Sequence, residues 1–320
     1  MILDFKKHIL FIITRSDDIG GAQIHVRDLA LWLTKKNYKV TIIVGGTGYY
    51  IDHLRDLGLQ VITCKSLQKN INLYSDFISL FKLYFLINKV NPDLISVHTP
   101  KAGILIRFLR LFKFIPKCIF TAHGWSFSIS NKFQKKLYLF LETFFSSIPE
   151  RIITVCQADL EIAKKYKITK ANNIICIHNG MPDINNFKQK KIKPNKQIKL
   201  IMTARFEPQK DHKLLIRTLS NLSNQNWHLT LLGKGKLKKN IWNMCENLKI
   251  LDKVEFIGWT KNVSEFLNKS DIYILTSNWE GFPRSILEAI RSGIPVIATD
   301  VGGISESVRH GINGFLIPRS

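Results

Sequence analysis

The stretch 271-DIYILTSNWEGFPRSILEAIRSGIPVIATD-300 contains two short apolar runs separated by an amphipathic segment. Residues 271–276 and 295–299 have the length and the β-branched content of buried strands. Between them, residues 285–292 have the apolar spacing of a helix, so the stretch predicts a β-α-β unit with parallel strands. In sheets built from such units, ligands bind outside the carboxyl ends of the strands.

The same alternation continues through the rest of the chain, with one interruption at residues 182–197, which lack apolar periodicity and are rich in Lys and Asn. Before this predicted linker we expect strands at 8–14, 39–44, 60–64, 93–98, 117–122, 151–156 and 173–177, and helices at 22–36, 73–90, 101–112, 132–147 and 157–167. After it we expect strands at 198–204, 228–232, 253–258, 271–276, 295–299 and 314–317, and helices at 212–222, 237–249, 262–269, 285–292 and 304–309. The sequence therefore predicts an α/β fold with two Rossmann-like, doubly wound domains, 1–181 and 198–320, facing each other across a cleft.

The amino-acid composition limits the classes of protein to which this chain can belong. Hydrophobic residues make up 45% of the 320 residues, enough for a core in each domain. The net charge of +23 favours nucleic acid, anionic membranes or phosphorylated ligands as partners. No nucleic-acid-binding module is recognisable, so we expect no nucleic acid partner. There is no signal peptide or long apolar run, and the five cysteines include no C-x-x-C pair, which predicts a cytoplasmic protein.

Two predicted helices of the first domain carry a pattern of basic and apolar residues that could form a membrane-facing surface. Basic residues alternate with Leu and Phe around two predicted helices, at Arg107, Arg110, Lys113, Lys132, Lys135 and Lys136. Such helices can hold a protein at an anionic lipid surface. Ordinary solvated helix faces explain the same pattern equally well, so both interpretations remain open.

The segment Glu280-Gly281-Phe282-Pro283-Arg284 follows a predicted strand and leads into a predicted helix that carries Glu288. Free backbone N–H groups and the positive end of the helix dipole favour phosphate or sugar oxygens at such a position. Glu288 lies about one turn into the helix, so both carboxylates can flank one ligand. Taken alone, the two glutamates could also be ordinary surface residues.

Residues 279–318 closely resemble the donor-binding region of glycosyltransferase family 4, a GT-B family. Residues 120–127 resemble the version found in the family's bacterial capsule and O-antigen enzymes. The family's hallmark is two glutamates separated by seven residues, as Glu280 and Glu288 are. The resemblance implies that Glu280 lies against the donor sugar, that Glu288 binds the ribose, and that the backbone of residues 281–284 contacts sugar hydroxyls. It further implies a retaining transfer from a nucleoside diphosphate sugar.

Two cations follow the predicted strand at 198–204. Arg205 and Lys210 have chemistry suited to a diphosphate, with a planar fork and a point charge, although ion pairs with Glu207 or Asp211 would explain them as well. The resemblance assigns both to the donor pyrophosphate. Because no Asp-x-Asp metal clamp is present, we expect neither a metal requirement nor another cofactor.

Two motifs lie in the first domain. Gly20 and Gly21 follow the first strand, where glycines allow a backbone to approach phosphate closely, or where a plain turn occurs. The resemblance implies that they close on the donor phosphates or the acceptor. His123, in Thr121-Ala122-His123-Gly124-Trp125, follows another strand, and the family places a histidine there near the donor sugar.

The predicted function is transfer of a sugar to a glycan or lipid-linked glycan in cell-surface polysaccharide synthesis, with Glu280 and His123 as catalytic residues. A GT-B-fold epimerase or hydrolase and an impaired binding protein are the alternatives. A nicotinamide oxidoreductase lacks its glycine fingerprint here. No helix follows the last predicted strand, and family members continue with further helices, so we expect a second domain truncated at its C-terminus.

Overall fold

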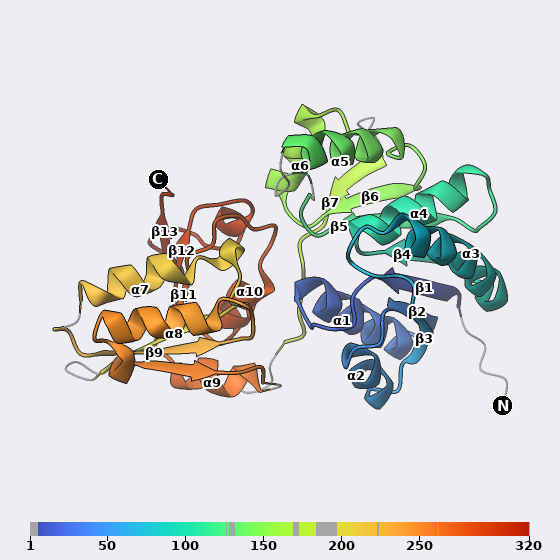
Figure 1. Ribbon diagram of the computed structural model, residues 1–320. Coiled ribbons are helices and arrows are strands. Elements are labelled where there is room, and N and C mark those ends of the chain that lie inside the picture. The colour runs from blue at the N-terminus through green and yellow to red at the C-terminus, as the bar shows by residue number, and fades with distance from the viewer. Residues whose placement is uncertain are drawn as a thin grey trace. The chain divides into compact units, whose positions relative to one another are not determined.

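The computed structural model describes residues 6–125, 127, 132–168, 173–183, 197–222, 224–260 and 262–319. It divides into two compact units, Met1–Gly180 and Met181–Ser320, each built around one parallel sheet (Figure 1). Most of the predicted linker lies outside the described residues. The expected α/β fold with two Rossmann-like domains is confirmed.

The first unit has the strand order β3-β2-β1-β4-β5-β6-β7, with every neighbouring pair parallel. Its strands are β1 (His8–Ile13), β2 (Lys39–Gly45), β3 (Gln60–Cys64), β4 (Leu94–Val97), β5 (Cys118–Ala122), β6 (Arg151–Thr154) and β7 (Ile174–Cys176). Its helices are α1 (Gly21–Lys35), α2 (Tyr50–Asp56), α3 (Leu73–Val90), α4 (Pro100–Leu111), α5 (Lys132–Phe144) and α6 (Gln157–Lys165).

Both faces of this sheet are buried, which explains why its strands are continuously apolar in sequence. In β1, Ile9, Phe11 and Ile13 contribute to a core with residues of α1 and α2. Leu10 and Ile12 contribute to a second core, with residues of α3 and α4. This division follows from the two-residue period of a strand.

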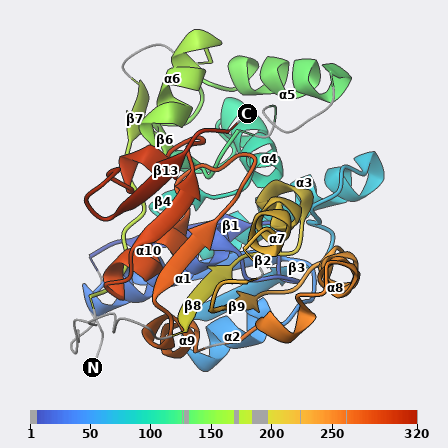
Figure 2. The ribbon, with the colours of Figure 1, turned by 90° about the vertical axis from the view of Figure 1, so that its left-hand side faces the viewer.

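The second unit has the order β10-β9-β8-β11-β12-β13, again with parallel pairs. Its strands are β8 (Ile198–Thr203), β9 (Trp227–Leu232), β10 (Val254–Ile257), β11 (Ile272–Leu275), β12 (Val296–Thr299) and β13 (Gly314–Ile317). The helices are α7 (His212–Ser220), α8 (Lys238–Asn247), α9 (Val263–Lys269) and α10 (Arg284–Arg291), with 3-10 turns η3 (Pro208–Lys210), η4 (Leu251–Lys253) and η5 (Ile304–Glu306). Helices α7 and α8 lie side by side in both views (Figures 1 and 2).

Two sequence-based assignments of helices were wrong. The helix expected at residues 304–309 is only the turn η5, because Gly302 before it has a left-handed φ of 57° and Gly311 soon follows. Helix α2 was not predicted, since it has only seven residues and its periodic signal rests on Tyr50, Ile51 and Leu54.

Arg107 was also wrongly placed on a basic surface. Its side chain is 1% exposed, donates to Glu142 Oε2 at 2.8 Å, and lies 4.5 Å from the centre of the Phe120 ring. Buried charges require such pairing. Arg110 is partly buried and paired with Glu150, so neither arginine contributes an open cation to α4.

Candidate functional site

In the second sheet, strand order reverses between the adjacent strands β8 and β11, and this is the usual ligand position in doubly wound sheets. The loops that follow these two strands are joined by hydrogen bonds. The Asn278 amide donates to Gln209 O at 2.7 Å, and Gln209 Nε2 donates to Trp279 O at 2.8 Å. Thr276 Oγ1 donates to Asp211 O at 3.0 Å. The two loops therefore form one rigid unit.

This unit brings together Lys210 and Glu280, which are 70 residues apart in the chain. Lys210 Nζ donates to Glu280 Oε1, and the Ser277 hydroxyl donates to the same oxygen at 2.6 Å. The Glu280 side chain is 6% exposed and that of Lys210 is 14% exposed. Glu280 is thus a carboxylate held in place by a cation and a hydroxyl, and Ser277 is a member of the group that sequence reasoning missed.

Arg205 lies in the same loop as Lys210 but closer to solvent. Its guanidinium is 3.3 Å from Glu207 Oε1, and a third of its side chain is exposed. The ion pair considered from the sequence therefore forms. An exposed pair of this kind contributes little to stability, so it can exchange for a stronger anionic ligand at small cost.

Helix α10 begins at Arg284, directly after the Glu280 loop, and carries Glu288 on its second turn. Phe282, Pro283 and Arg284 are buried, so the loop is anchored to the body of the domain. Burial raises the pKa of the Tyr273 hydroxyl, and the nearby charges of Glu288 and Glu280 raise it further. Both glutamates therefore act on one buried hydroxyl, and their binding of a single ligand stays a prediction.

Gly302 and Gly303 pack against the backbone of Glu280 and Gly281. The Gly303 amide donates to Gly281 O at 2.9 Å. A Cβ on Gly302 would lie 1.9 Å from Glu280 O, so only glycine fits this contact. Glycine is also required at position 233. A Cβ there would lie 2.0 Å from Ala204 O, directly before Arg205.

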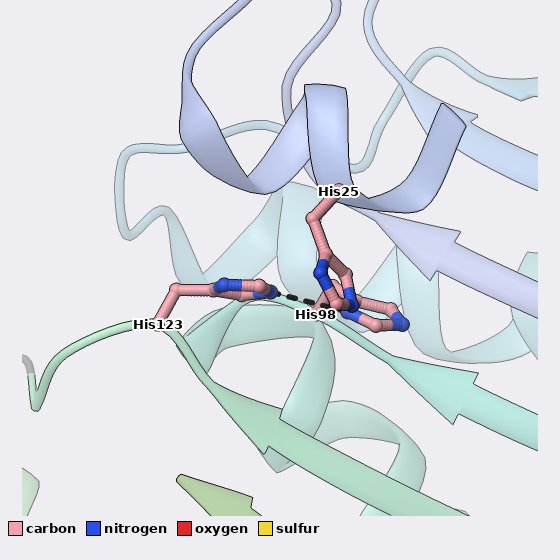
Figure 3. A group of neighbouring side chains, drawn as sticks. All are labelled: His25, His98 and His123. Atoms are coloured by element: carbon pink, nitrogen blue, oxygen red, sulfur yellow. Dashed lines mark hydrogen bonds between the residues drawn. The ribbon is translucent and has the colours of Figure 1, made fainter. Parts of the chain in front are cut away.

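In the first sheet the strand order reverses between β1 and β4. A cluster of three histidines lies at this edge: His25 on α1, His98 after β4 and His123 after β5 (Figure 3). The ring of His98 is buried, with Nδ1 3.2 Å from His123 Nε2 and Nε2 2.8 Å from Ser96 Oγ. The His25 ring centre is 5.3 Å from that of His98 and 5.0 Å from that of His123.

Burial holds the pKa of His98 well below its ordinary value, and the neighbouring His123 and His25 lower it further. His98 is therefore neutral at physiological pH. Only His123 had been singled out as a site residue from the sequence. His98 was missed because no local motif surrounds it. His25 follows the Gly20-Gly21 motif but was given no role, because only the fold brings the three histidines together.

Two models of protein families match this chain. Residues 19–183, just over half of the chain, match the model described as Glycosyltransferase Family 4, and residues 183–320 match Glycosyl transferases group 1. The chain belongs to glycosyltransferase family 4.

Relatives of this glycosyltransferase include bacterial O-antigen enzymes. It is 28% identical over 314 residues to the Escherichia coli UDP-Gal:alpha-D-GlcNAc-diphosphoundecaprenol alpha-1,3-galactosyltransferase, covering 93% of this chain and 80% of that enzyme. It is 29% identical over 315 residues to the O-antigen biosynthesis glycosyltransferase WbnH of Escherichia coli, covering 97% and 86%. The crystal structure of Anabaena Alr3699/HepE in complex with UDP and glucose shares the fold, with a TM-score of 0.82, 21% identity, and coverage of 98% and 86%.

The remaining sites expected in this glycosyltransferase are Gly20 and Gly21. Gly20 is the N-cap of α1, with an extended φ of −99°, and Gly21 is the first residue of the helix. A Cβ on Gly21 would meet no atom within 4 Å. Packing within the domain does not require glycine here, so their proposed closeness to phosphate stays a prediction.

Proposed function

We propose that this glycosyltransferase uses a nucleoside diphosphate sugar as donor, transfers a hexose with retention at the anomeric carbon, and needs no metal ion. The contact between Lys210 and Glu280 carries the donor assignment, and retention is proposed from the membership of the family. In such a donor the anomeric carbon is bonded to an oxygen of the β-phosphate. A cation for the diphosphate and a carboxylate for the sugar hydroxyls must therefore lie next to each other, as Lys210 and Glu280 do.

The chemistry follows from these groups. As the bond between sugar and phosphate breaks, negative charge develops on the leaving nucleoside diphosphate. In this proposal Lys210, Arg205 and the N-terminus of α10, which follow the adjacent strands β8 and β11, stabilise this charge. Glu280 accepts hydrogen bonds from sugar hydroxyls, and Glu288 accepts them from the ribose. In the first domain, His123 is the proposed catalytic partner beside the donor sugar.

For the acceptor we propose a lipid-linked glycan of cell-surface polysaccharide synthesis. One E. coli relative is named for a diphosphoundecaprenol-linked acceptor. No helix in the described part of the chain is long and apolar enough to span a bilayer. Because a lipid-linked acceptor lies in a membrane, we propose that the protein docks on the membrane surface to reach it.

The first unit has a surface suited to such docking, which we call the aromatic ridge. Aromatic rings of α3, of α4 and of the segment after α4 contact one another in series, with centres 5.3–6.0 Å apart. Phe85, Phe108, Phe112 and Phe114 are exposed, and Tyr84, which links Phe85 to Phe114, is partly buried. Exposed Lys82, Lys89 and Lys113 flank these rings in the chain. Aromatic rings beside lysines suit an anionic lipid surface.

Donor binding is tested by titration calorimetry with UDP. Arg205→Ala and Lys210→Ala should each weaken binding by about ten- to a hundredfold, the effect of losing a charge-assisted contact of about 1.5–3 kcal/mol. Lys213→Ala, on the exposed side of α7, is the matched control and should bind normally. Unchanged affinity in both test variants would falsify the diphosphate assignment.

Product analysis separates transfer from the alternatives. With a UDP-hexose and a lipid-diphosphate glycan, NMR should show a glycosidic product with the anomeric configuration of the donor, formed equally well with EDTA. Free hexose or an epimerised nucleotide sugar as the sole product would identify a hydrolase or an epimerase instead.

Membrane docking is tested with liposomes. Binding to anionic vesicles should fall steeply between 50 and 500 mM salt, on the order of several-fold, because surface charges are screened. Phe85→Ser and Phe112→Ser should weaken it, whereas Trp242→Ser, an exposed aromatic of the second unit, should not. Equal binding to neutral and anionic vesicles would contradict the electrostatic component.

A further inference from the structure

The geometry points to a transition-metal site at the three histidines of the first unit, and we propose that His25, His98 and His123 bind Zn²⁺ or a similar borderline ion. One ring nitrogen of each histidine lies within 4.8 Å of those of the other two. Three imidazoles are the protein ligands of one common class of zinc site, in which the fourth position stays open to water or a substrate.

The His98–His123 pair already has the separation that a metal requires. Two nitrogens bound to a tetrahedral zinc ion at about 2.0–2.1 Å are about 3.3–3.4 Å apart. His98 Nδ1 and His123 Nε2 are 3.2 Å apart, so an ion can replace their hydrogen bond without a change in this separation. Both rings must turn so that their lone pairs meet at the ion, and the proton of the hydrogen bond must leave the ligating nitrogen. His25 closes the site by a small rotation of its side chain on α1, which points toward the pair (Figure 3).

Ser96 provides the outer partner that metal-binding histidines ordinarily have. Its hydroxyl lies 2.8 Å from His98 Nε2, the nitrogen that faces away from the cluster. When Nε2–H donates to Ser96, the Nδ1 lone pair is directed toward His123. Imidazole ligands favour Zn²⁺, Cu²⁺ and Ni²⁺ over Mg²⁺ and Mn²⁺, which prefer oxygen.

Occupation of the site has a consequence that rests on the proposed function. His123 is the proposed catalytic partner beside the donor sugar, and a nitrogen bound to zinc cannot contact a sugar. A bound ion therefore inhibits transfer, so this metal is a regulator and the metal-independent transfer proposed above is retained.

The first experiment measures binding alone, on the full chain without a histidine tag. Titration with Co²⁺ should give one equivalent of the intense visible absorption of a tetrahedral site, and Zn²⁺ should displace it. His25→Ala and His123→Ala should each weaken Zn²⁺ binding by at least about 100-fold, and Ser96→Ala by about 10–100-fold, as outer partners do. His228→Ala, on β9 of the second unit, is the matched control and should bind normally.

Circular dichroism and the urea midpoint establish that each variant is folded. Absence of the cobalt spectrum in the wild-type chain, or its full retention in His123→Ala, overturns the site.

The second experiment compares transfer with and without one equivalent of Zn²⁺ within each protein. The wild type should lose at least about tenfold and His25→Ala should show no zinc effect. Zinc that binds without changing transfer overturns the catalytic role of His123 and leaves the metal site standing, so the two failures are distinguishable.

Discussion

The support of the Glu280 backbone by Gly302 can be tested by a single methyl group. In Gly302→Ala the new Cβ would lie 1.9 Å from Glu280 O, while real contacts of a Cβ are essentially never shorter than 3.0 Å. One of the two backbones must therefore move by about 1.1 Å, the difference between these distances. Such a displacement of a substrate-positioning group lowers the rate by about 10²-fold.

The magnitude of the stability change follows from two terms. Gly302 has a φ of 57°, and a left-handed conformation costs an L-residue about 1–2 kcal/mol. The clash adds about 1–3 kcal/mol. Gly311→Ala isolates the first term, because Gly311 has a φ of 76° and a Cβ there meets no atom within 4 Å.

Urea unfolding and steady-state kinetics with a UDP-sugar are the assays for this pair. Gly311→Ala should lose about 1–2 kcal/mol of unfolding free energy and keep its kcat/KM. Gly302→Ala should lose more stability and about 10²-fold in kcat/KM. If a folded Gly302→Ala protein transfers sugar as fast as Gly311→Ala, the backbone contact does not position Glu280.

Three further predictions concern the glutamates, a buried histidine and a buried ion pair. Glu280→Gln should lower kcat more than it weakens UDP binding, whereas Glu288→Ala should weaken UDP binding itself; identical kinetic and calorimetric signatures would contradict this division of roles. Burial, assisted by Lys210, lowers the pKa of His212 from 6.5 to about 4, so the folded state disfavours its protonated form. The free energy of unfolding therefore falls as pH falls from about 6.5 toward about 4, by about 2 kcal/mol between pH 7 and pH 5. Urea unfolding of a His212→Gln variant should lack this contribution to the pH dependence of stability. Arg107→Ala leaves the buried Glu142 carboxylate unpaired and should cost about 3–5 kcal/mol, and a loss below 1 kcal/mol would show that Glu142 finds solvent or a proton instead.

Much of the fold was predictable from local pattern. The predicted strands correspond to strands of the structure, with ends that differ by at most two residues. The reason is that strands buried on both faces appear as short apolar runs, and the helices between them have a different period. The pattern fails for α2 and at residues 304–309, where a segment of one or two turns gives too few repeats for periodicity to be read.

The candidate site was predictable only in part. The spacing of Glu280 and Glu288, and the cations Arg205 and Lys210, could be picked out because each group is contiguous in sequence and follows a strand. The buried ion pair of Arg107 could not be predicted from the sequence. An arginine among Leu and Phe has the same sequence pattern on a solvated helix face and in a buried ion pair.

The sequence by itself determined that two parallel α/β domains form and which loops lie at the carboxyl ends of their strands, because periodicity and turn chemistry act over a few residues. Only the tertiary structure decided that Lys210 contacts Glu280 across 70 residues, and that His25, His98 and His123 meet. These contacts depend on strand order, since adjacent parallel strands bring their ends together whatever their separation along the chain. Strand order is set by the packing of helices on both faces of the sheet. These packing interactions involve the whole domain, so no short stretch of sequence determines them.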